Sequence, residues 1–158
     1  MYTAILDAKN WWNEAIDGPA TAVGDEFGFE VEGLHRVRLR VTRLVPGELV
    51  EWVVIDNYFN FVEDQSEWVG DRIEFALENG DGSTTLRFTQ HGLVPELECY
   101  DVCSNAWGFF IRDSLRQLAE HGAGQSETRS GTAVPADRAR AAADARAHGL
   151  NALSLIHI

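Results

Sequence analysis

The apolar residues of this chain change from an alternating to a helical spacing after Pro95, and that change constrains the fold more than any other feature. Residues 2–16 suit one or two short helices, and in the runs that follow them apolar and polar side chains alternate, as do Phe27, Phe29 and Val31 in the run EFGFEV. This alternation is typical of strands in a sheet with one buried face. After Pro95 the spacing lengthens to three or four residues and continues to Gly122, which indicates one long helix. The order of the two patterns predicts an α+β fold, with an antiparallel sheet followed by a C-terminal helix.

The predicted helix has an apolar stripe along its whole length. Its cysteines, Cys99 and Cys103, are four residues apart on this stripe, where a helical turn gives poor geometry for a disulfide. Together with His91 they are also candidates for a metal site or for a nucleophilic catalytic site. Thiols on a core-facing stripe, however, usually pack as small apolar residues. We therefore expect reduced core cysteines, no metal site and no catalytic residue. The stripe consists of Cys99, Cys103, Ala106, Trp107, Phe110, Ile111, Leu115 and Leu118.

A Pro-Gly pair sets the register of the first long hairpin. If Pro46 and Gly47 form a two-residue loop, Val41 lies opposite Trp52 on the inner face. Pro-Gly prefers a type II turn, which suits hairpin twist less well than the primed types, and a longer loop of the same parity would keep this pair. The same parity places Asp56 on the inner face, unless the strand has already left the sheet and Asp56 caps a loop.

A second hairpin is predicted around the turn signal NGDG, at residues 79–82. Either two-residue loop within that signal places Ile73 and Phe75 on the face that also contains Phe88. Gln90 then falls on the same inner face, again unless the strand has ended before it. Burying an unpaired polar group costs a few kcal/mol, so the inward polar residues of both hairpins are predicted to orient the polar end of a ligand.

Composition limits the number of domains and the classes of partner. The 158 residues, of which 45% are apolar, suffice for one well-buried domain and not for two. A net charge of −12 repels nucleic-acid phosphates and anionic lipid surfaces, so neither is an expected partner. No Gly-rich phosphate loop is present, and we expect no cofactor. No apolar run is long enough to span a bilayer and no secretory leader follows Met1, which favours a cytoplasmic location.

The C-terminal part of the sequence differs in composition from the rest. Residues 122–152 are rich in Gly, Ser, Ala and Arg and contain no aromatic residue, so we expect a low-complexity disordered tail after a domain of residues 1–121. The last six residues, LSLIHI at 153–158, resemble a translated sequencing adaptor, and we expect them to be an artefact without biological meaning. The alternative is an ordinary apolar C-terminal tail.

The order of several motifs resembles one protein family. Short helices with a tryptophan pair, strands containing ELVEW and GDGSTTLRFTQHGL, and a long helix containing AWGFF resemble the activator of heat-shock-protein ATPase homologue family. This family lies within the START-like, or SRPBCC, superfamily of helix-grip folds, and the resemblance covers residues 2–121. It implies a curved antiparallel sheet wrapped around the C-terminal helix, with an apolar cavity between them. Members begin with a strand before the first helix, so we expect an N-terminally truncated chain with a missing first strand and an unpaired sheet edge.

The tryptophan pair is expected to take part in this cavity. Neighbouring helical residues point about 100° apart, so Trp11 and Trp12 cannot both enter one core face in the same way. In a helix-grip fold the short helices close one end of the cavity, which predicts one ring in the core and the other at the mouth. The alternative is that both rings only fill space between helix and sheet.

The resemblance, together with the inward positions, predicts the function and the site. The preferred function is non-catalytic binding of a small apolar or aromatic ligand in the cavity. One alternative is a co-chaperone-like module that stimulates a heat-shock chaperone ATPase, although we do not expect the separate N-terminal domain that accompanies this fold in such co-chaperones. Another is a cyclase or hydratase with Asp56 as its base. The predicted site residues are Trp12, Phe27, Phe29, Leu39, Trp52, Asp56, Trp68, Ile73, Phe75, Phe88, Gln90, Trp107 and Phe110.

Overall fold

A computed structural model describes residues 1–127 and 153–157 of the chain. In these residues six antiparallel strands form one sheet in the order of the sequence. The strands are β1 (Glu26–Val31), β2 (His35–Val45), β3 (Leu49–Phe59), β4 (Arg72–Gly80), β5 (Ser83–His91) and β6 (Leu153–His157). Two short helices, α1 (Tyr2–Leu6) and α2 (Ala8–Trp11), precede the sheet. The C-terminal helix consists of α3 (Tyr100–Phe109), the π-helical turn η1 (Phe110–Leu115) and α4 (Arg116–His121).

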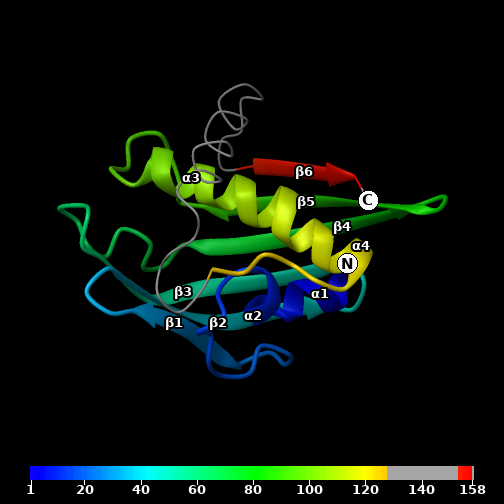
Figure 1. Cartoon of the computed structure of the whole chain (residues 1–158), viewed down its shortest axis with the longest axis horizontal. Helices are drawn as coiled ribbons and strands as arrows, with labels where there is room; N and C mark the ends of the chain where they lie inside the picture. The colour runs from blue at the N-terminus through cyan, green and yellow to red at the C-terminus, as the bar shows by residue number, and fades with distance from the viewer. Residues whose placement is uncertain (128–152, 158) are drawn as a thin grey trace.

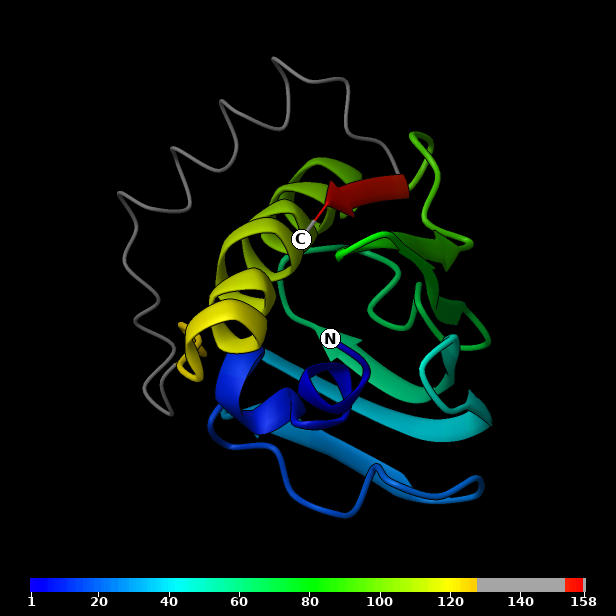
Figure 2. The same ribbon diagram turned by 90° about the vertical axis from the view of Figure 1, so that its right-hand side faces the viewer.

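The sheet curls around the C-terminal helix, which crosses its concave face (Figures 1 and 2). The N-terminal helices lie below the last turns of that helix in Figure 2, where α1 contacts β3 and α2 contacts η1. The core between these layers is formed by the inward side chains that alternate along the strands, as the sequence pattern predicts. The predicted α+β helix-grip fold is therefore confirmed.

The C-terminal helix ends as predicted but contains an unexpected wide turn. Gly122 adopts a left-handed conformation with a φ of 78°, which only glycine takes without strain, and the helix stops there. Within η1 the side chain of Ser114 is fully buried. Its hydroxyl donates to the carbonyl of Trp11 at 2.7 Å and accepts the N–H of Gln125 at 2.6 Å. The π-helical turn thus joins the N-terminal helices to the chain beyond the helix.

The turn between β2 and β3 is one residue longer than predicted. Val45 pairs with Leu49, so the loop consists of the three residues 46–48. The N–H of Glu48 donates to the carbonyl of Val45 at 2.9 Å, and Gly47 has a φ of 76°. This is the type II turn that a Pro-Gly pair favours, and the additional residue is what fits it between the strands.

Two β-bulges then decide which residues of this hairpin face inward. Thr42 is an extra residue on β2, and it compensates for the longer loop, so Val41 still lies opposite Trp52 as predicted. Ile55 is an extra residue on β3, and it reverses the faces of the residues that follow. Asp56 therefore lies on the outer face, and its predicted inward position is wrong.

The second hairpin agrees with its prediction. Gly80 pairs with Ser83 around a two-residue loop, and Phe75 lies opposite Phe88 on the inner face. Gln90 is also inward, with 1% of its surface exposed. The strand β5 therefore still includes Gln90, and the alternative, in which the strand ends before Gln90, is wrong.

The chain beyond Gly122 does not leave the domain at once. Residues 122–127 return along the N-terminal helices, where the N–H of Glu127 donates to the carbonyl of Trp12 at 2.8 Å. The carbonyl of Glu127 in turn accepts the N–H of Glu14 at 2.9 Å. Backbone hydrogen bonds therefore hold residues 122–127 against the N-terminal segment, although residues 122–127 have little apolar surface. The domain boundary at residue 121 stays a prediction. The rest of the predicted tail, residues 128–152, lies outside the described residues.

The strand β6 pairs antiparallel with β5, from Thr85 opposite His157 to Thr89 opposite Leu153. β6 therefore occupies the edge of β5 that does not pair with β4. Figure 1 shows β6 beside β5. The artefactual origin of residues 153–158 and the missing first strand stay predictions.

Candidate functional site

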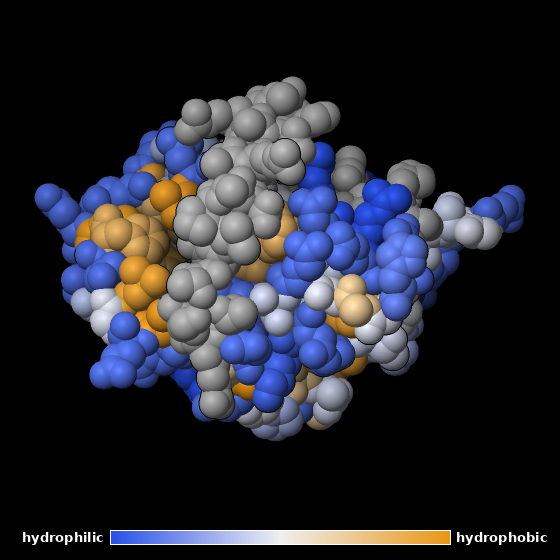
Figure 3. Space-filling view, in the orientation of Figure 1, coloured by the Kyte–Doolittle hydropathy of each residue, from blue (hydrophilic) through white to orange (hydrophobic). Residues whose placement is uncertain are grey.

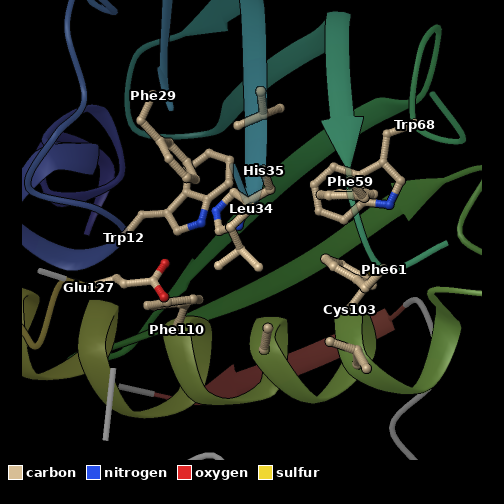
Figure 4. A pocket seen from close by; sticks show the side chains of 13 residues that line it. Trp12, Phe29, Leu34, His35, Phe59, Phe61, Trp68, Cys103, Phe110 and Glu127 are labelled. Atoms are coloured by element: carbon tan, nitrogen blue, oxygen red, sulfur yellow. The ribbon is translucent and has the colours of Figure 1, made fainter. Parts of the chain in front are cut away.

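A mainly apolar pocket of about 190 Å³ lies between the sheet and the first half of the C-terminal helix (Figure 4). Strands β1 to β3 form one wall, the loop of residues 60–71 forms a second, and α3 with the start of η1 forms the third. Its lining residues are Trp12, Phe29, Leu34, His35, Val37, Phe59, Phe61, Trp68, Val102, Cys103, Ala106, Phe110 and Glu127.

The sheet wall is a chain of aromatic contacts. The Phe29 ring meets the His35 imidazole edge to face at a centroid distance of 5.2 Å, and His35 contacts Phe59 at 6.3 Å. Phe59 faces inward because the bulge at Ile55 shifts the alternation of β3 by one residue. The same bulge that removes Asp56 from the inner face therefore brings Phe59 into the pocket wall.

A buried asparagine positions the second wall. Asn57, with 3% of its surface exposed, donates from Nδ2 to the carbonyl of Gln65 at 3.2 Å. Its Oδ1 accepts the N–H of Trp68 at 3.1 Å. These bonds hold the loop of residues 60–71 against β3, and the Trp68 indole meets Phe59 at 5.0 Å. The loop thus supplies an ordered aromatic wall.

The same loop also fixes the start of the helix. The carboxylate of Glu67 accepts the N–H of Glu98 at 3.0 Å and the N–H of Cys99 at 3.3 Å, just before α3 begins. A carboxylate at this position satisfies backbone donors of the first turn and suits the positive end of the helix dipole. The Trp68 indole N–H donates to the sulfur of Cys99 at 3.3 Å, so the second and third walls are bonded to one another.

The cysteines are structural, as predicted. Cys99 and Cys103 are both buried and reduced. The hydrogen bond with Cys99 and burial raise the pKa of the Cys103 thiol far above its usual range, so Cys103 lines the pocket as a neutral thiol. Within residues 1–127, no group of three His, Cys, Asp or Glu side chains could hold a metal ion.

Two further ionisable side chains, His35 and Glu127, belong to the lining. Glu127 has 3% of its surface exposed, and its Oε2 accepts a hydrogen bond from Nδ2 of Asn13 at 3.3 Å. Figure 4 shows its carboxylate beside Trp12 and Phe110, directed toward the space between them. The sequence does not predict Glu127 as a site residue, because the surrounding composition is typical of a tail.

The tryptophan pair is divided between core and pocket. Trp11 is fully buried, and its indole N–H donates to the carbonyl of Ile5 at 3.2 Å. Trp12 stacks on Trp11 with centroids 6.1 Å apart, and it also lines the pocket. Since Trp12 is only 4% exposed, it lies at the inner wall of the pocket and not at its rim.

The structure brings four of the predicted site residues together in the pocket, namely Trp12, Phe29, Trp68 and Phe110. Most of the others are buried in the core next to it and do not line the pocket. Those core residues are Phe27, Leu39, Trp52, Ile73, Phe75, Phe88 and Trp107. The lining residues that were not predicted include Val37 and Cys103, which strand parity and the helical stripe could have suggested. Phe59 and Phe61 follow a bulge, which the sequence does not reveal.

Gln90 is inward, but its hydrogen bonds go to protein groups. Its Nε2 donates to Oδ2 of Asp71 at 2.7 Å, and its Oε1 accepts the indole N–H of Trp107 at 2.6 Å. Burial, and to a lesser degree the neighbouring Glu67, raise the pKa of Asp71, while the bond from Gln90 opposes this shift. This network supports the core beside the pocket, and Gln90 is not a lining residue.

Asp56 lies away from the pocket. Its Oδ2 accepts a hydrogen bond from Nε of Arg36 at 2.7 Å on the outer face, and 46% of its side chain is exposed. An exposed carboxylate on the convex face cannot touch a ligand inside the sheet. The roles predicted for Asp56, orienting a ligand or acting as a base, are therefore wrong.

The mouth of the pocket is apolar. Figure 3 shows hydrophobic surface gathered at the end of the molecule where the long loops and the start of α3 lie (Figure 1). Phe61 and Val102, which line the pocket, are 44% and 56% exposed. None of the helices within the described residues has the length and apolar character needed to cross a membrane.

Comparisons with known proteins agree with this fold. No family model and no curated protein matches the chain. Among solved structures, the chain is similar to the solution structure of the Aha1 dimer from Colwellia psychrerythraea, with 29% sequence identity and a TM-score of 0.59. The similarity covers 78% of this chain and 87% of that chain. It confirms the resemblance that the order of the motifs predicts.

Proposed function

Because the chain is Aha1-like in sequence and fold, we propose that it is a helix-grip binding domain that holds a small apolar or aromatic ligand in its pocket without reacting with it. The pocket itself carries the proposal, since it is walled by aromatic rings and opens at an apolar mouth. A cavity of about 150 Å³ in another protein binds benzene. A volume of about 190 Å³ therefore suits one ring with a short substituent better than a sterol.

The lining supports binding more than catalysis. Cys103 is a neutral thiol with a strongly raised pKa, which makes it a poor nucleophile. Asp56, the base that a cyclase or hydratase would need, lies on the outer face. No observation on the described residues favours the enzyme alternative.

A thermal-unfolding screen tests the proposal. We expect monocyclic aromatics and short fatty acids to raise the melting temperature, because a ligand at a hundredfold excess over Kd adds about 2.7 kcal/mol to the free energy of unfolding. Val102→Trp, at the mouth, is expected to abolish this shift. The matched control is Val69→Trp, which changes a valine of similar exposure outside the lining. If none of the compounds stabilises the wild-type chain, the binding proposal is wrong.

A second candidate function follows from the likeness to Aha1. In this proposal the apolar mouth docks on a heat-shock chaperone in the cytoplasm and stimulates its ATPase. The exposed Phe61 and Val102 support it, because contiguous apolar surface commonly marks an interaction site. The test is the ATPase rate of the chaperone with added wild-type chain or with Phe61→Ser. Stimulation that the variant lacks would support this function, and an unchanged rate with wild-type chain would exclude it for the chaperone tested.

A further inference from the structure

We propose that the mouth of the pocket docks a basic peptide segment of a partner protein, which inserts one large apolar side chain into the pocket and places Lys or Arg side chains on its rim. The inference deepens the docking function and rests on it, because it names the chemistry of the segment that the mouth takes. It starts from the apolar mouth and from the distribution of charge around it.

The rim of the mouth is acidic. It consists of two segments, the loop of residues 60–71, which contains Phe61, and residues 92–102, which lead into α3 and end at Val102. Neither segment contains Lys, Arg or His. Their seven acidic residues are Glu63, Asp64, Glu67, Asp71, Glu96, Glu98 and Asp101. Much of the net charge of −12 is therefore concentrated beside the pocket.

Hydrogen bonds hold the two acidic segments together. The N–H of Glu63 donates to Oε2 of Glu98 at 3.1 Å. The carboxylate of Glu67 accepts the N–H groups of Glu98 and Cys99 at 3.0 Å and 3.3 Å. Since Phe61 precedes Glu63 by only two residues, carboxylates from both segments border the apolar mouth.

The rim differs from the outer face of the sheet in how its acids are compensated. On the outer face Arg36 pairs with Asp56 at 2.7 Å and Arg40 pairs with Glu26 at 2.6 Å. None of the ion pairs formed within the described part of the chain includes a carboxylate of the rim. Lys or Arg side chains of a partner would supply the positive charge that these carboxylates lack, and such complementarity steers association and selects the partner.

The pocket supplies the place for an apolar anchor. Phe61 and Val102 are 44% and 56% exposed at its opening, and Figure 3 shows hydrophilic surface next to the hydrophobic surface at this end. A volume of about 190 Å³ suits one aromatic side chain, because a cavity of about 150 Å³ in another protein binds benzene. Apolar anchors in a pocket, with a polar rim around them, carry much of the affinity of protein interfaces. A second copy docked mouth to mouth is disfavoured, since the two rims have the same charge.

Three capped peptides make the test: GKKFKKG, GEEFEEG and GKKSKKG. The second reverses the charge of the first and keeps its phenylalanine, whereas the third keeps the charge and replaces the phenylalanine by serine. Affinities for the full chain are measured by isothermal titration calorimetry or ligand-observed NMR. We expect GKKFKKG to bind about tenfold more tightly than GEEFEEG and about fivefold more tightly than GKKSKKG. Equal affinity of GKKFKKG and either counterpart would overturn the proposal.

Two double variants separate the rim from the general field of an acidic protein. Glu63→Gln with Asp101→Asn removes two exposed charges from the rim, and GKKFKKG should bind it about fivefold more weakly. Glu48→Gln with Asp81→Asn is the matched control. It removes the same two charges from hairpin turns, which the lengths of β3 and β4 separate from the loop of residues 60–71, so the affinity should change less than twofold. An equal loss in both variants would show that only the net charge acts, and the rim would have no role.

The peptides also separate this inference from the docking function. If wild-type chain stimulates the chaperone ATPase but binds GKKFKKG no better than GEEFEEG, the basic segment is wrong and the docking function stands. If GKKFKKG binds as expected and the ATPase rate does not change, the inference stands and the chaperone tested is not the partner. The comparison of peptides on wild-type chain needs no variant, so the test remains decisive even if a double variant folds poorly.

Discussion

The interior of this domain has two aromatic regions that sequence alone does not distinguish. In the packed cluster, formed by Trp11, Trp52, Phe75 and Phe88, Phe75 meets Trp52 at 4.8 Å and Phe88 at 5.2 Å. The pocket wall, formed by Phe29, Phe59, Trp68 and Phe110, encloses a space instead. Both regions lie between the same sheet and the same helix, so their aromatic content does not explain the difference.

The difference lies in how the sheet continues. Around the packed cluster β3 pairs with both β2 and β4, so rings from adjacent strands interdigitate. The pairing of β3 with β4 ends at Val53, and the second half of β3 pairs with β2 alone. The loop of residues 60–71 takes the place of the missing strand partner and leaves a hollow behind its aromatic side chains. A loop in place of a strand thus separates the pocket from the packed core.

The largest effect is expected from truncating the packed cluster. Phe75→Ala should lower the free energy of unfolding by about 3 to 5 kcal/mol, because the fully buried ring leaves a cavity between its neighbours. Phe61→Ala, in the half-exposed mouth, should cost less than about 1 kcal/mol. Urea unfolding of both variants measures the contrast, and equal losses would show that the two regions are packed alike.

Gln90→Leu is expected to affect stability and leave binding unchanged. The substitution leaves the Trp107 indole N–H and the Asp71 carboxylate without their bonds to Gln90, which should cost about 2 to 3 kcal/mol. Gln117→Leu on the helix surface is the matched control. Urea unfolding and titration with a pocket ligand measure the two effects. A tenfold loss of affinity in Gln90→Leu would return Gln90 to the ligand site that the sequence predicts.

The tryptophan pair compares the two regions at adjacent positions. Trp11→Phe removes a buried hydrogen bond to the carbonyl of Ile5 and should destabilise the domain by about 1 to 2 kcal/mol without altering ligand affinity. Trp12→Phe removes the same ring system from the pocket wall and should change ligand affinity with a smaller loss of stability. If both variants behave alike in melting and titration, the pair only fills space.

The regular part of the fold follows from the sequence. Alternation identifies β1 to β5, and the Asn-Gly and Asp-Gly signals give the β4–β5 register. The β2–β3 hairpin shows the limit of this reasoning. Its predicted two-residue loop is wrong, and Val41 still faces Trp52 only because the bulge at Thr42 compensates. Bulges depend on strand twist and on neighbouring loops. Counting alternate residues from the turn takes neither into account.

The site was less predictable than the fold for the same reason. One bulge at Ile55 exchanges Asp56 for Phe59 on the inner face. Glu127 enters the pocket through backbone hydrogen bonds, which low-complexity composition neither requires nor forbids. Phe75 and Phe29 follow the same alternating pattern along their strands, and both face inward. Only the three-dimensional packing shows that Phe75 lies in the core and that Phe29 lines the pocket.

Asp71 gives the packed region a pH-dependent stability. Its pKa is raised from 3.8, mainly by burial, so the folded chain binds a proton more tightly than the unfolded chain. The resulting stabilisation is present below the unfolded pKa and is lost as pH rises through the folded pKa. Asp71→Asn should flatten this part of the stability curve. Urea unfolding of both chains between pH 3.5 and 7 checks it, and unchanged slopes would contradict the burial of Asp71.

The smallest effect is expected at Asp56, where the sequence places a ligand contact and the structure places a surface ion pair. Asp56→Asn weakens the bond to Arg36 on the outer face, where solvent screens both charges, so the melting temperature should fall only slightly. Ligand affinity should not change, because Asp56 lies on the convex face and the sheet separates its carboxylate from the pocket. Titration of the variant with a pocket ligand therefore tests the bulge itself. A tenfold change in affinity would require Asp56 to face inward, which would mean that β3 lacks the extra residue at Ile55 and that Phe59 does not border the pocket.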